Sequence, residues 1–240
     1  MKSISSTSVI ILGVSIALGL FLGGLTISRA LYKTRAADRF VTVKGLAERE
    51  VPADLAIWPI TFKEVGNDLT SLQKNIDRNR DLITGFLVEQ GFEKTGISHS
   101  PPRIIDVQAE NYYGDRNQPY YRFKAQTTVT LRSGEVQKVK ETMEKSGELV
   151  GKGIVMAENW ENRTEFLFTS LNEIKPGMIR EATINAREAA DKFAEDSGSK
   201  VGNIRKATQG LFSISDRDAN SPDIKVVRVV TTMEYFLTDN

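Results

Sequence analysis

The sequence predicts an α+β fold in which a strand-strand-helix unit is repeated three times and followed by a C-terminal hairpin. The helices are expected to pack on a mainly antiparallel sheet. Two patterns predict this class: β-branched and aromatic residues cluster in short segments, and apolar residues recur at helical spacing over longer segments. From residue 40 onward, the two kinds of segment follow one another in the same order three times. We therefore expect one α+β domain over residues 40–240.

Residues 1–39 have a different chemistry. No charged side chain occurs between Ser3 and Ser28, and Val9–Ile27 is a nearly unbroken apolar run. A helix of about 19 residues just spans the hydrocarbon core of a bilayer, which is about 30 Å thick. We therefore expect a short tail over residues 1–7, a single-pass transmembrane anchor in the lipid bilayer over residues 8–28, and a polar stalk over residues 29–39.

Two other interpretations of this segment stay open. A cleaved signal peptide would use the small residues around Ala30, although signal peptides have shorter apolar regions of about 7–15 residues. A buried helix is the third interpretation. The basic residues that follow the segment, Arg29, Lys33, Arg35 and Arg39, outnumber Lys2 before it. The positive-inside rule, taken alone, would place the large C-terminal part in the cytoplasm.

The first cycle comprises strands over Phe40–Gly45 and Leu55–Val65 and a helix from Leu69 to Leu87. Asp68 is a suitable N-cap for this helix, and Gly91 is a suitable stop. The second cycle follows the same plan. Its strands are expected over Ile104–Tyr113 and Arg122–Leu131, and its helix between Ser133 and Gly147.

The third cycle contains strands over Ile154–Asn159 and Glu165–Leu171 and the longest helix of the domain. Pro176 suits the first turn of this helix and Gly198 suits its C′ position. Its predicted buried face carries mostly small side chains, which let a helix lie close to a sheet: Ile179, Ala182, Ala186, Ala189, Ala190 and Phe193.

A closing hairpin is expected from strands over Ile204–Ile214 and Lys225–Leu237. The second of these strands is apolar on both faces, which predicts an interior position in the sheet.

The connection between the first two strands contains an unusual cluster of charges and prolines. Pro52-Ala53-Asp54 predicts a turn that joins the strands in a hairpin, and Gly45 predicts a bend or bulge. Pro59 lacks an N–H group, so its strand is expected to be bulged or at an edge there. We expect the charged residues nearby to lie at the solvated ends of the hairpin rather than to form a catalytic patch.

Composition excludes several classes of function. The chain has 32 basic and 31 acidic residues, a net charge of +1 and no concentrated basic block. Nucleic acid is therefore not an expected partner, because its binding needs a basic face. The absence of cysteine from the sequence excludes thiol catalysis, disulfides and thiolate metal sites.

No motif predicts a catalytic residue, a cofactor or a metal. His99 is the one histidine of the chain and lies in a loop-like Ser-His-Ser-Pro-Pro context. Asp216, Asp218 and Asn220 resemble the start of a calcium loop, but Ser221 and Val227 stand where the loop needs glycine and glutamate. Turn chemistry explains the same residues. We expect no enzyme activity.

Four tyrosines surround one predicted hairpin loop: Tyr112, Tyr113, Tyr120 and Tyr121. Three interpretations stay open for them. They pack against one another across the hairpin, they form a subunit contact, or they stack on the sugars of a cell-wall ligand.

Three small residues, Ser15, Gly19 and Gly23, recur at four-residue spacing in the predicted anchor. Residues at this spacing lie on one helix face, and small side chains there let membrane helices approach closely. They are therefore candidates for helix association, and incidental composition is the alternative explanation.

Three segments carry a resemblance to a known family: VKGLAEREVPADLAIWPITF (43–62), LFTSLNEIKPGMIREATINAREAADKFAEDSGSKVGNIRKATQG (167–210) and VVRVVTTMEYFL (226–237). They resemble the bacterial SIMPL-domain family, a periplasmic or envelope domain of poorly defined function. The Pro-Ala-Asp and Ala-Ile-Trp-Pro sequences resemble a membrane-anchored subgroup.

The resemblance implies a bacterial inner-membrane protein whose C-terminal domain faces the periplasm, opposite to the orientation that the basic flanks favour. It also implies self-assembly, into rings in some members, and it supplies no catalytic residues. We expect a non-enzymatic, homo-oligomeric scaffold with a role in envelope or oxidative stress protection. The alternatives are a periplasmic module that binds cell-wall glycan or peptide, and an unrecognised hydrolase.

Overall fold

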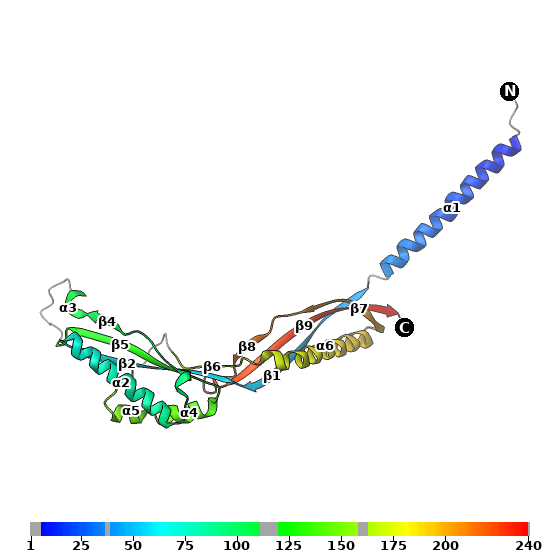
Figure 1. Cartoon of the computed structure of the whole chain (residues 1–240). Helices are drawn as coiled ribbons and strands as arrows, with labels where there is room; N and C mark the ends of the chain where they lie inside the picture. The colour runs from blue at the N-terminus through cyan, green and yellow to red at the C-terminus, as the bar shows by residue number, and fades with distance from the viewer. Residues whose placement is uncertain (1–5, 37–38, 111–119, 158–162, 240) are drawn as a thin grey trace. The chain divides into compact units, whose positions relative to one another are not determined.

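The computed structural model describes residues 6–36, 39–110, 120–157 and 163–239 (Figure 1). The fold class is α+β with antiparallel sheets, as predicted. The chain divides into two compact units. The first unit comprises residues 1–48, 175–213 and 228–240, and the second comprises residues 49–174 and 214–227.

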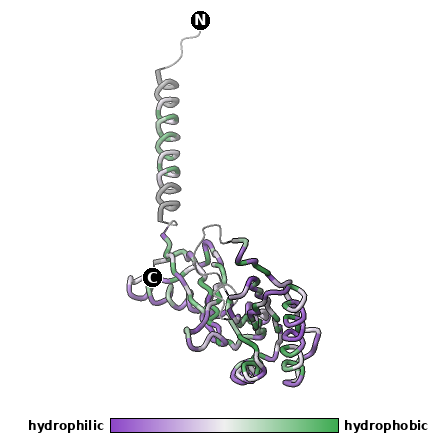
Figure 2. The backbone as a smooth tube through the Cα atoms, turned by 90° about the vertical axis from the view of Figure 1, so that its left-hand side faces the viewer, coloured by the Kyte–Doolittle hydropathy of each residue, from purple (hydrophilic) through white to green (hydrophobic). Residues whose placement is uncertain are grey.

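The segment predicted as an anchor lies within helix α1 (Ser6–Ala36). Figure 2 shows hydrophobic residues along the stretch of α1 whose side chains are described. Within the described residues, however, no helix contains a stretch that is both long and apolar enough to cross a membrane. Residues 8–28 are thus helical in the structure, and their predicted role as an anchor stays a prediction.

The first sheet has the order β1-β9-β7, and β8 also pairs with β9. Its strands are β1 (Phe40–Pro52), β7 (Ser199–Gln209), β8 (Ser213–Asp216) and β9 (Ile224–Asp239). The predicted interior position of the C-terminal strand is confirmed, because β9 lies between β1 and β7. The predicted hairpin of the first two strands is wrong, because β1 pairs in this sheet and β2 pairs in the other.

Helix α6 (Leu171–Asp196) packs on the first sheet through a row of small side chains. Its buried residues are Met178, Ala182, Ala186, Ala190 and Ala194, whereas the predicted core residue Phe193 is 54% exposed. Pro176 lies inside the helix rather than in its first turn, because the helix begins five residues earlier. Gly198 follows the helix at φ +68°, which confirms its C′ position.

Gly45 lies in β1 at a point where the strand closely approaches α6. A Cβ atom at this position would meet the Ala182 carbonyl oxygen at 1.8 Å and the Ala186 backbone nitrogen at 2.4 Å. Glycine is needed here for the approach of one backbone to another, and the predicted bend or bulge stays a prediction.

The second unit contains a five-stranded sheet of order β3-β5-β2-β6, with β4 also paired to β5. Its strands are β2 (Leu55–Gly66), β3 (Ile97–His99), β4 (Arg103–Asp106), β5 (Phe123–Ser133) and β6 (Glu165–Leu167). Its helical elements are α2 (Leu69–Glu89), η1 (Lys94–Gly96), α3 (Val107–Glu110), α4 (Val136–Glu144) and α5 (Gly147–Gly151). Helices α2, α4 and α5 lie on one side of this sheet (Figure 1).

The core of the second unit forms between this sheet and its helices. The apolar stripe of α2 includes Leu72, Ile76 and Ile83, all at most 1% exposed, and it packs with Phe62 and Val129 of the sheet. The predicted boundaries of α2 are confirmed within two residues, because its signals are local. Asp68 caps the helix by accepting a hydrogen bond from the Ser71 N–H at 2.7 Å, and Gly91 ends it at φ +85°.

Several predicted elements of the second unit are shorter than expected. The strand predicted over Ile104–Tyr113 becomes β4 followed by α3, and its last three residues lie outside the described residues. Of the strand predicted over Ile154–Asn159, the described part contributes one bridge between Phe62 and Met156. Gly147 begins α5 instead of ending a helix. Ser133 lies three residues before α4 and accepts a hydrogen bond from the Glu135 N–H.

Candidate functional site

The candidate site is a basic groove on the sheet face of the second unit opposite α2. Phe62 of β2 and Val129 of β5 point toward α2 and are buried. Successive side chains of a strand alternate between the two faces, so Lys63 and Val65 of β2 point to the other face. In β5 the same alternation places Lys124 and Gln126 on that face.

The strand register brings six side chains of this face into two rows. Gln126 pairs with both Lys63 and Arg103, which gives the row Lys63–Gln126–Arg103. Lys124 pairs in the same way with Val65 and Ile105, which gives the row Val65–Lys124–Ile105. Neighbouring strands lie about 4.8 Å apart, so the outer members of each row are separated by about 10 Å at the backbone. Three cations thus surround one amide side chain.

These residues line a groove of about 430 Å³. Glu64 also contributes to its lining, but this carboxylate accepts a hydrogen bond from the buried Asn79 of α2. At the end of β4, Asp106 forms an ion pair with Arg122 at 2.8 Å. The hydrogen bond from the Arg122 side chain holds the pKa of Asp106 below its ordinary value. Both neighbouring carboxylates are therefore engaged by other partners.

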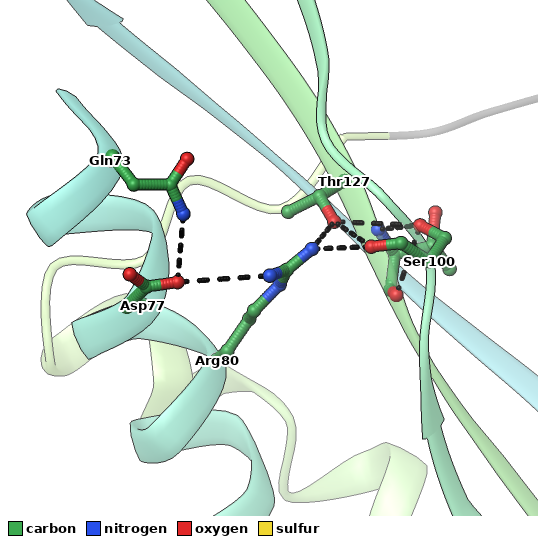
Figure 3. Close-up of polar contacts among 6 residues, drawn as sticks. Gln73, Asp77, Arg80, Ser100 and Thr127 are labelled. Carbon is green, nitrogen blue, oxygen red and sulfur yellow. Dashed lines mark hydrogen bonds and ion pairs between the residues drawn. The ribbon is translucent and has the colours of Figure 1, made fainter. Parts of the chain in front are cut away.

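A polar network fixes the strand that carries Arg103 and Ile105 (Figure 3). Strands β3 and β4 pair with the same strand, β5, on either side of the Pro101-Pro102 sequence. Prolines cannot donate to a ladder, and Ser100 compensates. Its N–H donates to the Thr128 carbonyl at 2.9 Å, and its hydroxyl accepts from the Thr128 N–H at 2.9 Å.

Arg80 of α2 connects this interruption to the helix layer. Its guanidinium donates to the Ser100 carbonyl and, at 3.0 Å, to the Thr127 hydroxyl (Figure 3). On the helix, Oδ1 of Asp77 lies 3.7 Å from Nη1 of Arg80. The same oxygen accepts a hydrogen bond from the Gln73 side-chain amide at 2.9 Å. The side chain of Arg80 is 18% exposed. The network therefore binds the start of β4 to α2 and sets the position of one wall of the basic groove.

The Pro52-Ala53-Asp54 connection is a second polar centre of the same unit. The Ala53 N–H donates to the Asp223 carbonyl at 2.8 Å, and the Asp54 N–H donates to the Leu167 carbonyl at 2.9 Å. The Asp54 carboxylate accepts from the N–H groups of Thr169 and Ser170 at 2.7 and 2.8 Å. Partial burial acts to raise the pKa of Asp54, but the hydrogen bonds from Ser170 and Thr169 outweigh it and lower the pKa.

A family model matches residues 41–233, which include most of both units. It is the model of SIMPL, described as a protein of unknown function (DUF541). The chain belongs to the SIMPL family. No curated protein matches the chain.

The tyrosines predicted as an interface or ligand site of the SIMPL domain are partly described. Tyr120 is 84% exposed and Tyr121 is 40% exposed, and their rings meet edge to face with centroids 4.7 Å apart. Tyr112 and Tyr113 lie outside the described residues. The three interpretations of the group therefore stay predictions.

The small residues predicted to mediate helix association lie in α1. Ser15, Gly19 and Gly23 follow one another at four-residue spacing and therefore share one face of the helix. A Cβ atom at Gly19 or Gly23 would meet no atom within 4 Å. The association itself stays a prediction.

The acidic residues that resemble a calcium loop are bound to donors of the SIMPL domain itself. Asp218 accepts hydrogen bonds from Arg217 at 3.1 Å and from the Asn220 N–H at 2.8 Å. Asp216 forms an ion pair with Lys225, whose side chain is 9% exposed. Among the described residues, no group of three or more acidic or histidine side chains is arranged to hold a metal.

Sequence reasoning missed the basic groove of the SIMPL domain. Its cations lie on three strands and are separated by up to 61 positions in the sequence, from Lys63 to Lys124. Period-two alternation could have placed Lys63 with Val65 and Lys124 with Gln126 on common faces. The register that brings the pairs together, and the addition of β4 to β5, depend on non-local pairing that no local signal specifies.

Proposed function

We propose that this SIMPL protein is a non-catalytic scaffold that acts by assembling with copies of itself through the first sheet. The observation that carries the proposal is the length of the two edge strands of this sheet. The order β1-β9-β7 places β1, with 13 residues, at one edge and β7, with 11 residues, at the other. Strands of globular proteins typically have about 5–6 residues.

Edge strands of this length favour pairing between chains. The outer N–H and C=O groups of an edge strand have no partner within the sheet, so they can pair with a strand of another chain. Leu46 of β1 is 40% exposed and Ile204 of β7 is 53% exposed. Apolar side chains on the edge strands add burial to the backbone hydrogen bonds when a second strand docks.

The two edge strands differ in sequence, so pairing between them joins two different surfaces of neighbouring copies. Pairing of β1 in one copy with β7 in the next is a head-to-tail contact, and such contacts form a ring when the rotation closes. This supports the ring-forming scaffold that we propose. We propose a role in envelope or oxidative stress protection for the assembled protein.

The proposal predicts that charges on the edges reduce the assembly. We expect Leu46→Lys combined with Ile204→Lys to lower the mass of the full-length protein in light scattering, because a lysine on an edge strand disfavours strand addition. Val150→Lys is the matched control, since Val150 is 57% exposed on α5 of the second unit. An assembly that is unchanged in the double variant would contradict pairing through these edges.

We further propose that helix α1 holds the protein at the bacterial inner membrane with the SIMPL domain in the periplasm. The apolar run Val9–Ile27 and the envelope location implied by the family resemblance support this placement. We expect a C-terminal alkaline phosphatase fusion to be active and a C-terminal fluorescent fusion that needs the cytoplasm to be dark. The reverse pattern would place the domain in the cytoplasm, as the basic flanks alone favour.

A second candidate function is a periplasmic binding module for cell-wall glycan or peptide. It is favoured by the exposure of Tyr120 and Tyr121, since paired aromatic rings suit the apolar faces of sugars. A monomeric full-length protein that is retained by purified cell-wall material would favour this candidate over the scaffold.

A further inference from the structure

We propose that the basic groove of the second unit binds a multivalent anion, a ligand with two or three phosphate or carboxylate groups close together. The proposal concerns Lys63, Arg103 and Lys124 and is independent of assembly through the first sheet. The two rows Lys63–Gln126–Arg103 and Val65–Lys124–Ile105 place these cations around a groove of about 430 Å³.

The charge balance of the groove favours an anionic ligand. Lys63, Arg103 and Lys124 form no ion pair with any described residue. The two nearest carboxylates in sequence and register have other partners, because Glu64 accepts a hydrogen bond from Asn79 and Asp106 is paired with Arg122. Among the residues that line the groove, the three cations face a single carboxylate, Glu64, so positive charge is in excess. A bound anion would reduce the repulsion between the cations.

The arrangement of the polar groups in the groove suits a ligand with several charges. Gln126 lies between Lys63 and Arg103 in the register, and its amide can donate a hydrogen bond to an anionic oxygen between two cations. The backbones of the outer strands are about 10 Å apart, a distance that the long side chains of Lys63 and Arg103 can span to reach one ligand. A ligand with several charged groups can contact all three cations.

Lys124 has an apolar neighbour on each side. Val65 is 39% exposed and Ile105 is partly buried, and they stand on either side of Lys124. Apolar neighbours reduce the water around a cation and so strengthen its interaction with a bound anion. The small number of cations and the net charge of +1 favour a compact anion over nucleic acid, which needs an extended basic surface.

The position of Arg103 is set before any ligand binds. Arg80 fastens the Ser100-Pro101-Pro102 interruption to α2, and β4 begins directly after it (Figure 3). The wall of the groove is thus held by contacts that do not involve the three cations. Substitutions of these cations should therefore leave the fold intact.

The test is a calorimetric titration of the full-length protein with two probes, inorganic tripolyphosphate and citrate, at low and at high salt. The variant combines Lys63→Gln, Arg103→Gln and Lys124→Gln. The control combines Lys74→Gln, Arg78→Gln and Lys94→Gln, which removes the same charge from exposed positions on α2 and η1. Thermal unfolding verifies that both variants fold, and Arg103→Gln alone replaces the triple variant if the latter does not.

We expect saturable binding that weakens with salt and loses about tenfold or more of its affinity in the groove variant but not in the control. Binding of tripolyphosphate would identify phosphate as the preferred group, and binding of citrate without tripolyphosphate would identify carboxylate. Absence of binding for both probes would overturn the proposal. So would an equal loss of affinity in the variant and the control.

Discussion

Gly45 shows how one residue sets the packing of the first unit. Its hydrogen atoms face the backbone of α6 at Ala182 and Ala186, where the helix and β1 approach each other. The small side chains of α6 permit this approach, and the Asn185 side chain also donates to the Leu46 carbonyl at 2.7 Å. The contact therefore depends on glycine in the strand and alanine in the helix together.

We predict that Gly45→Ala lowers the free energy of unfolding of the first unit by about 3 kcal/mol, because overpacking against backbone atoms cannot be relieved by side-chain movement. Gly85→Ala in α2 is the control, since a Cβ atom there would meet nothing within 4 Å. Alanine also has the higher helix propensity, so this control should be neutral or stabilising. Chemical denaturation of both variants measures the difference, and equal effects would contradict the packing role of Gly45.

Residues with local roles could be predicted from the sequence, and residues with contacts to distant segments could not. Asp68 and Gly91 lie within one turn of the ends of α2, so their capping roles follow from residue type and position. The closeness of Gly45 to α6 could not be predicted, because it involves residues about 140 positions away in the sequence. The sequence predicted a bend or bulge at Gly45 instead. A glycine in a strand indicates a close approach or a bulge, and the sequence does not distinguish the two.

At the scale of elements, Asp54 connects the start of β2 with the segment that precedes α6. Its carboxylate accepts hydrogen bonds from the Thr169 N–H, the Thr169 hydroxyl and the Ser170 N–H. These residues stand just before Leu171, the first residue of the helix. Asp54 thus fixes this segment from more than 100 positions away, whereas a typical cap lies in the same stretch of chain.

We predict that Asp54→Asn lowers the free energy of unfolding by about 1 kcal/mol at pH 7, a modest value because the carboxylate is partly exposed. The folded state lowers the pKa of Asp54 below its ordinary value of 3.8. Its stabilisation is therefore complete above pH 3.8 and is lost as the pH falls through the lowered pKa. The difference between the two proteins should shrink below this pH.

Denaturant unfolding between pH 7 and pH 2 measures this dependence. Asp81→Asn is the control, because Asp81 is exposed on α2 and has no ion pair or hydrogen bond to the described residues. A difference for Asp54→Asn that stays constant down to pH 2 would contradict the role of the ionised carboxylate.

The elements themselves could be predicted better than their pairing. The bounds of β2, α2 and β5 agree with the sequence prediction within two residues, because each has a clear period and clear end signals. The hairpin of β1 and β2 was wrong, because Pro52-Ala53-Asp54 marks a turn and does not specify which strands pair across it. The sequence SHSPP could not reveal that Ser100 and Arg80 together bridge the interruption between β3 and β4.

At the scale of the whole molecule, the family match extends over residues 41–233 and so includes residues of both units. The two units offer different surfaces. The first sheet has two long edge strands, β7 in the first unit and β1 mostly in it, which we propose for assembly. The second unit has the basic groove, which we propose for anion binding. If both proposals hold, each copy in an assembly carries its own anion site.

Light scattering of the full-length protein over a range of concentrations gives its mass in solution and so tests assembly directly. We expect a discrete multimer whose size stays constant above a threshold concentration, because closed head-to-tail contacts define the number of subunits. A protein that remains monomeric throughout the range would contradict assembly as the function of this chain.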